Sequence, residues 1–111
     1  MLKVNWGLDE AIALFELYAF YNMSTKIKVE DLEDLRRMYL KRAKLLNLEI
    51  DNKFRNIDGL NLQLQCIEFV VKGEGYGLGH SAKVFYDVYN LYLYNHKTYI
   101  RILADFYKEY N

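Results

Sequence analysis

The sequence lacks proline, so no residue in it interrupts a helical backbone, and helices must end at glycines and capping residues instead. Its one cysteine, Cys66, excludes an internal disulfide and is typical of a protein of the reducing cytoplasm. No apolar run approaches the ~18 residues of a membrane-spanning helix, and residues 1–5 carry no signal-peptide core. We therefore expect a cytoplasmic protein without membrane association.

An excess of charge of either sign is also missing. Fifteen Lys and Arg residues balance fifteen Asp and Glu residues, and the formal net charge is zero. A protein that holds nucleic acid mainly by neutralising its phosphates is normally basic, whereas a protein that imitates DNA is acidic. The overall charge argues against both classes.

The chain has 111 residues, of which 52% are hydrophobic and 27% charged, as expected for one globular domain over residues 1–111. Its eleven tyrosines, with abundant Asn, Lys and Ile, suggest the AT-rich genome of a low-GC bacterium or one of its phages. One small core has no room for so many rings, so some are expected at the surface, as at interaction faces. They crowd the C-terminal third: Tyr86, Tyr89, Tyr92, Tyr94, Tyr99, Tyr107 and Tyr110.

Apolar residues recur with the 3.6-residue period of a helix along five segments, and no stretch alternates as a strand would. The expected helices span residues 8–22, 29–47, 57–72, 82–94 and 97–110. We therefore predict an all-α fold, a single compact domain of four to five helices. The first segment is apolar around most of its circumference, which is typical of a central helix.

Each expected helix has an apolar face that can be assigned from the sequence. Phe15 and Leu64 lie on the most consistently apolar faces, so truncating either to alanine is expected to cost about 2–5 kcal/mol. The inner faces are predicted as Leu32, Leu35, Tyr39, Ala43 and Leu46 in the second segment, Leu60, Leu64, Ile67 and Val71 in the third, and Ile100, Leu103, Phe106 and Tyr107 in the last.

The stretch from Phe54 to Leu64 carries the most specific local signal. Asn56 is a good N-cap, because its side-chain oxygen can accept from the unpaired N–H groups of the first helical turn. Asp58 places a negative charge in that turn, where the helix dipole favours it. Gly59 costs about 1 kcal/mol relative to alanine inside a helix, so something is expected to approach it closely.

The charges of segment 29–47 are segregated, with acids at its start and bases toward its end. Arg37, Lys41 and Lys44 are spaced i, i+4, i+7 and form a basic stripe opposite the apolar face. One interpretation is that the charges only compensate the helix dipole in a solvated face. The other is that the basic stripe contacts phosphates or a partner.

Glycine occupies every second position of residues 73–79. This spacing matches neither a P-loop nor the G-x-G-x-x-G motif, and no strand precedes it, so a connector or a set of tight turns is expected. His80 or Ser81 is predicted to cap the helix that follows.

Residues able to catalyse a reaction or hold a metal do not form a recognisable pattern. Cys66, His80 and His96 lie far apart in the sequence and match no metal-binding spacing. Cys66 is expected to be a buried core thiol. We therefore predict no enzyme activity, no catalytic residue, no metal site and no cofactor.

In this order of features the chain resembles the helical domain that precedes the nuclease domain in many bacterial HNH endonucleases. That domain begins with a tryptophan before a hydrophobic helix and continues to a Phe-Arg-Asn-Pro-Asn-Gly block, a Leu-rich helix and a Gly-Leu turn. The matching residues here are Trp6, Glu10, Leu17, Tyr18, Leu32, Leu35, Arg36, Phe54, Arg55, Asn56, Gly59, Leu64, Gly77, Leu78 and Lys83.

The chain departs from that family at Ile57, where the family has proline, and at Asp58, where it has asparagine. It also contains no His-Asn-His metal finger. The resemblance therefore implies a recognition or regulatory module rather than a nuclease.

Two functions follow as expectations. The first is a module that binds nucleic acid or a nucleic-acid-processing protein complex. The second is a small phage or mobile-element protein that binds and inhibits a bacterial defence nuclease, of the anti-restriction or anti-CRISPR type. The candidate binding residues are Arg37, Lys41, Lys44, Lys53 and Arg55.

Arg55 has two predicted arrangements, because Phe54 and Asn56 fix the backbone on either side of it. Its guanidinium either returns to a carboxylate or carbonyl within the domain and orders the loop, or points outward as a fixed set of donors. In the second case it would join Lys53 and the basic stripe.

Overall fold

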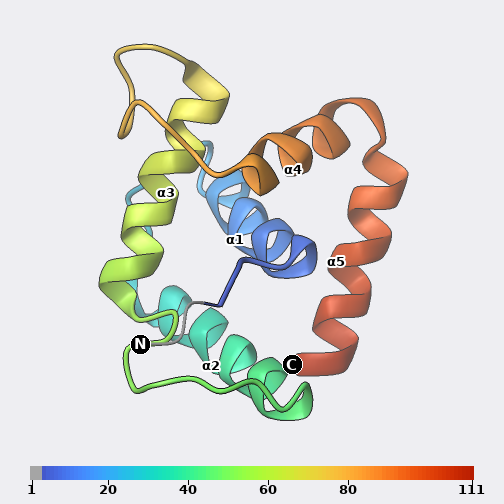
Figure 1. Cartoon of the computed structure of the whole chain (residues 1–111). Coiled ribbons are helices and arrows are strands. Elements are labelled where there is room, and N and C mark those ends of the chain that lie inside the picture. The colour runs from blue at the N-terminus through green and yellow to red at the C-terminus, as the bar shows by residue number, and fades with distance from the viewer. Residues whose placement is uncertain (1–3) are drawn as a thin grey trace.

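Helix α1 (Leu8–Phe20) lies at the centre of the molecule, and the other four helices surround it (Figure 1). The structure is a computed structural model and describes residues 4–111. Helix α1 packs against each of the other helices: α2 (Val29–Leu45), α3 (Ile57–Lys72), α4 (Lys83–Tyr94) and α5 (His96–Tyr110). The described residues contain no strand, and the prediction of a compact all-α domain is confirmed, with five helices.

The central position of α1 follows from its composition. Residues 10–15 are all buried, so this helix has neighbours on nearly every side. Phe15 is fully buried, and its ring lies 5.1 Å from that of Tyr92 and 6.1 Å from that of Tyr99. These contacts join α1 to α4 and α5. Aromatic pairs at such distances add to the stability gained by burial alone.

Without proline, the first two helices end at residues in the left-handed conformation. Asn22 and Met23 both have φ of 58° after α1, and Asn47 has φ of 55° after α2. The helices therefore stop at Phe20 and Leu45, two residues before the predicted ends. Such conformations cannot continue a right-handed helix.

The caps of the later helices confirm one prediction and correct another. The Asn56 side chain accepts a hydrogen bond of 2.8 Å from the Gly59 N–H, as predicted for the start of α3. A Cβ at Gly59 would lie only 2.9 Å from that oxygen, so the cap itself is the close approach expected at this glycine. The prediction that His80 or Ser81 caps α4 was wrong. The N-cap is Ala82, whose methyl side chain cannot accept a hydrogen bond, and the Ser81 hydroxyl donates to the Ala82 carbonyl instead.

Most predicted core positions are buried, including Phe15 and Leu64 at 0% exposure. Ile100 is 47% exposed, because α5 turns Tyr99 inward instead, where it packs on Phe15 and donates a 2.9 Å hydrogen bond to Glu16. Leu46 is 49% exposed because it is the C-cap residue, beyond the last turn of α2.

The glycine-rich segment 73–79 runs back against α3. Gly77 has φ of 59°, and a Cβ there would lie 2.0 Å from the Gln65 carbonyl oxygen, so only glycine fits. The Leu78 N–H donates to that same carbonyl, at 3.4 Å. The segment is thus a set of turns fixed at one point on α3, in line with the prediction of tight turns.

Candidate functional site

The residues predicted as functional lie in two different environments, and the first of these is buried around Glu10. Arg55 has φ of 48° and a side chain only 8% exposed. Its guanidinium carbon lies 4.1 Å from the centre of the Trp6 ring and 4.5 Å from that of Phe54. Arg55 is therefore held between two aromatic side chains, an arrangement that the planar guanidinium favours.

This guanidinium forms an ion pair with the Glu10 carboxylate, which is 0% exposed. Arg55 Nε donates to Glu10 Oε2 at 3.0 Å, and Arg55 Nη2 donates to Oε1 at 3.1 Å. Arg42 Nη1 lies 3.3 Å from Oε1, and Arg42 Nε donates to Asp9 at 2.9 Å. We name these two arginines and two carboxylates, Asp9, Glu10, Arg42 and Arg55, the Glu10 cluster. Their formal charges cancel, as the burial of charge requires.

The same carboxylate also fixes the start of α1. The Gly7 N–H donates to Glu10 Oε1 at 3.1 Å, half of a capping-box arrangement. The buried Tyr39 hydroxyl donates to the Glu10 carbonyl at 2.6 Å, and burial raises the pKa of that hydroxyl well above its ordinary value. A side chain of α2 is thereby joined to the first turn of α1.

The loop that carries Arg55 is tied to the rest of the molecule on both sides. Arg55 Nη2 donates to the Asn5 carbonyl at 3.1 Å. Arg36 of α2 donates from Nε to the Phe54 carbonyl at 3.2 Å and from Nη2 to the Asn52 carbonyl at 3.0 Å. Of the two arrangements predicted for Arg55, the structure has the internal one, because its donors face Glu10 and the N-terminal segment.

Four of the residues matched to the family pattern in the sequence meet at this cluster, namely Trp6, Glu10, Phe54 and Arg55. The sequence analysis did not predict that Arg42 and Asp9 belong to this cluster. No local signal marked them, because Asp9 and Glu10 are adjacent acids in the first turn of a helix, where the helix dipole alone would account for both.

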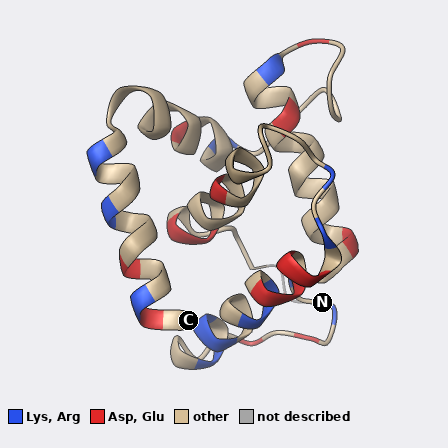
Figure 2. Ribbon diagram, turned by 180° about the vertical axis from the view of Figure 1, so that it is seen from behind, with Lys and Arg blue, Asp and Glu red and all other residues tan. Residues whose placement is uncertain are grey.

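The second environment is the exposed side of α2. Arg37, Lys41 and Lys44, the basic stripe, are all exposed, and Arg37 is paired with Asp34 on the same helix. Lys53, in the connection that follows, is also exposed. Lys41, Lys44 and Lys53 take part in none of the ion pairs formed within residues 4–111. Figure 2 shows the acidic first half and the basic second half of α2.

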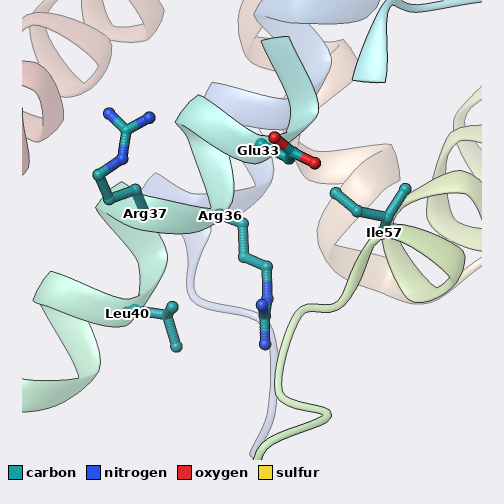
Figure 3. Close-up of a pocket in the computed structure, with 5 residues that line it drawn as sticks. All are labelled: Glu33, Arg36, Arg37, Leu40 and Ile57. Atoms are coloured by element: carbon teal, nitrogen blue, oxygen red, sulfur yellow. The ribbon is translucent and has the colours of Figure 1, made fainter. Parts of the chain in front are cut away.

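A shallow pocket of about 230 Å³ lies between α2 and the start of α3 (Figure 3). Arg36 points from α2 toward the 52–54 loop, which it binds, whereas Arg37 points away from it. The lining residues are Glu33, Arg36, Arg37, Leu40 and Ile57. The pocket thus borders the basic stripe but takes only Arg37 from it.

A second pocket, of about 360 Å³, lies beside the N-terminal segment, α3 and the start of α4. Its lining is mainly apolar with two amide side chains, Asn5 and Gln63. The other lining residues are Val4, Trp6, Ala82 and Val84. Such a surface can accept a small apolar group and offers it amide donors and acceptors.

Other titratable groups form bonds at the contact between α1 and α3. The Tyr18 hydroxyl donates to Glu68 at 2.6 Å, and Lys72 lies 2.9 Å from the same carboxylate. Burial, reinforced by Glu68, raises the pKa of Tyr18. Burial opposes ionisation of Glu68, but the hydrogen bonds from Tyr18 and Lys72 outweigh it and lower the pKa of that carboxyl.

The tyrosines divide between core and surface, as expected. Tyr18, Tyr39 and Tyr99 are fully buried, whereas Tyr86 is 42% exposed and Tyr94 is 82% exposed. Tyr86 and Tyr94 belong to α4, so that helix presents aromatic surface to the outside; Tyr76 and Tyr107, at 51% and 37%, are exposed elsewhere.

The chain matched no family model, no curated protein and no solved structure in comparisons with known proteins. Within residues 4–111, no helix is long and apolar enough to span a membrane. The same residues contain no group of three or more His, Cys, Asp and Glu side chains arranged to hold a metal ion. Cys66 is buried, as predicted, and burial raises the pKa of its thiol.

Proposed function

We propose that this chain is a non-catalytic recognition module, related to the helical domain that precedes the nuclease domain of HNH endonucleases, and that it binds nucleic acid or a nuclease complex. Its contact surface is the basic stripe together with Lys53. Its place would be the reducing cytoplasm, where a lone thiol such as Cys66 stays reduced.

The observation that carries the proposal is the exposure of cationic side chains that form no ion pair. Lys41, Lys44 and Lys53 are exposed and form no ion pair within residues 4–111. Cations of this kind are available to phosphates or to the carboxylates of a partner. Arg55 is left out of the contact surface, because its guanidinium is bonded to Glu10.

The module is proposed as non-catalytic because its buried and partly buried carboxylates already have partners. Glu10 binds two arginines, Glu16 accepts from Tyr99, and Glu68 accepts from Tyr18. Each of these bonds joins two helices or a helix and a loop, which is a structural use of the group.

Binding to DNA tests the first form of the proposal. We expect the double variant Lys41→Ala/Lys44→Ala to weaken binding of a fluorescent duplex, measured by anisotropy between about 50 and 200 mM salt. The matched control is Lys97→Ala/Arg101→Ala, which removes the same charge from exposed positions of α5. Equal weakening by the two double variants would show that only net charge matters and would contradict a contact surface on α2.

A second candidate function is a phage or mobile-element protein that binds and inhibits a bacterial defence nuclease. The exposed rings of Tyr86 and Tyr94 favour it, since tyrosine is enriched at protein interfaces. A host protein that co-purifies with the chain equally well before and after nuclease treatment would support this function. A protein lost on nuclease treatment would favour nucleic acid as the bridge.

A further inference from the structure

The end of α2 exposes apolar side chains beside the unpaired lysines. Leu45 is 59% exposed, Leu46 is 49% exposed and Ile50 is 37% exposed. The backbone explains this, because the left-handed turn at Asn47 directs Leu48 toward the core and leaves the preceding leucines outside. Leu48 is held there by its N–H, which donates to the Ala43 carbonyl at 2.9 Å.

Of these apolar residues, Leu45 lies beside the lysines on the outside of α2. Lys41 precedes Leu45 by four residues, one helical turn, so their side chains are neighbours on the outside of α2. Lys44 is adjacent to Leu45 in sequence and exposed as well. We name this set, Lys41, Lys44, Leu45, Leu46 and Ile50, the α2 end surface.

We infer that the α2 end surface is a docking site for an acidic segment of a partner protein that also carries apolar side chains. The inference rests on the proposed function and deepens it, because it names a protein rather than bare nucleic acid as the molecule bound. Carboxylates of the segment pair with Lys41 and Lys44, and its apolar side chains cover Leu45, Leu46 and Ile50.

Charge complementarity favours a protein over a duplex. The exposed face of α2 begins with Glu30 and Asp34 and becomes basic only in its second half, as Figure 2 shows. A duplex laid along this helix, which is about 25 Å long, would bring phosphates against those carboxylates. A short acidic segment avoids this repulsion, because it can cover the basic half alone.

The small number of unpaired lysines also favours a protein segment over duplex DNA. Lys41, Lys44 and Lys53 would neutralise about three phosphates, whereas proteins with strong salt-dependent DNA binding make about 6–10 such contacts. The leucines gain nothing from a phosphate backbone. A protein segment buries them, and exposed apolar side chains bordered by charge are typical of protein interaction sites.

The test compares three fluorescent probes by anisotropy: a synthetic peptide that alternates Glu and Leu, poly-glutamate, and duplex DNA. Lys41→Glu/Lys44→Glu tests the charge, and Leu45→Ser/Leu46→Ser tests the apolar part. The matched control is Lys97→Glu/Ile100→Ser, which changes one exposed cation and one exposed apolar residue of α5. Circular dichroism verifies that each variant is folded, and amide NMR shifts locate the bound peptide.

We expect the Glu-Leu peptide to bind more tightly than poly-glutamate and DNA and to shift amides at the end of α2. Each α2 double variant should weaken it about tenfold or more, and the control should not. Tight DNA binding that depends on the lysines but not on the leucines would overturn this inference and leave the proposed function standing. If no probe shifts amides at the end of α2, both fail.

Discussion

The Glu10 cluster and the basic stripe are built from the same kinds of residue but use them in opposite ways. In the cluster, Arg55 and Arg42 are largely buried and share the fully buried Glu10 carboxylate. In the stripe, Lys41 and Lys44 are exposed and have no carboxylate partner within residues 4–111. The first arrangement orders a loop, and the second leaves charge available to another molecule.

The comparison shows that residue type alone does not assign a cation to a binding surface. Arg36 and Arg37 are consecutive, yet Arg36 binds two backbone carbonyls of the 52–54 loop and Arg37 pairs with Asp34 at the surface. A buried carboxylate or an unpaired carbonyl decides which arginine turns inward, because leaving such a group unpaired is costly.

The largest effect is expected for Glu10→Ala. It leaves two arginines without their shared carboxylate, which should lower the free energy of unfolding by about 3–5 kcal/mol in urea titrations. Asp34→Ala, which breaks an exposed pair, is the matched control and should cost at most about 1 kcal/mol. A Glu10→Ala protein as stable as Asp34→Ala would show that the cluster does not stabilise the fold.

The next largest effect is expected at Arg55. Arg55→Ala should lower the free energy of unfolding by about 2–4 kcal/mol, less than Glu10→Ala, since Arg42 still neutralises part of the Glu10 charge. Arg55→Lys should recover little, because lysine can neither donate as a planar fork nor stack between Trp6 and Phe54 in the same way. Arg55→Gly should be about 1 kcal/mol more stable than Arg55→Ala, because φ is 48° at this residue. The reverse order would contradict a left-handed backbone at Arg55.

A smaller effect is expected at Glu68, which is intermediate in exposure. Because its folded-state pKa lies below the ordinary value of 4.5, it stabilises the fold above that pH and loses this contribution as the pH falls through the lowered pKa. Lys72→Met should make the acid-side fall in thermal midpoint shallower. Parallel pH profiles for the wild type and Lys72→Met would show that the Glu68–Lys72 pair contributes nothing.

The smallest effect on stability is expected at Lys41. Lys41→Ala should change the free energy of unfolding by less than about 0.5 kcal/mol, because its side chain has no partner within the described chain. Measured beside Arg55→Ala, it separates the two regions: Arg55→Ala should lower stability, and Lys41→Ala should alter only binding. If Lys41→Ala changes neither stability nor binding, the basic stripe is only a solvated face.

Much of the fold was predictable because local signals and tertiary packing agree. The start of α3 was set by Asn56, whose cap bond is present, and the buried faces of α3 followed from its 3.6-residue period. The predictions that failed lie where several residues compete for one position. At α5, both Tyr99 and Ile100 could have faced inward, and the aromatic partner at Phe15 favoured Tyr99.

The sequence by itself determined the helical class, the order of the five helices and the segregation of charge along α2, because periodicity and capping act between residues close in the chain. Only the tertiary structure decided where each cation goes. Arg55 meets Glu10 across a sequence separation of 45 residues, and no local rule encodes that pairing. The physical reason is that a carboxylate buried in α1 requires a cation, and the fold brings the guanidinium of Arg55 to it.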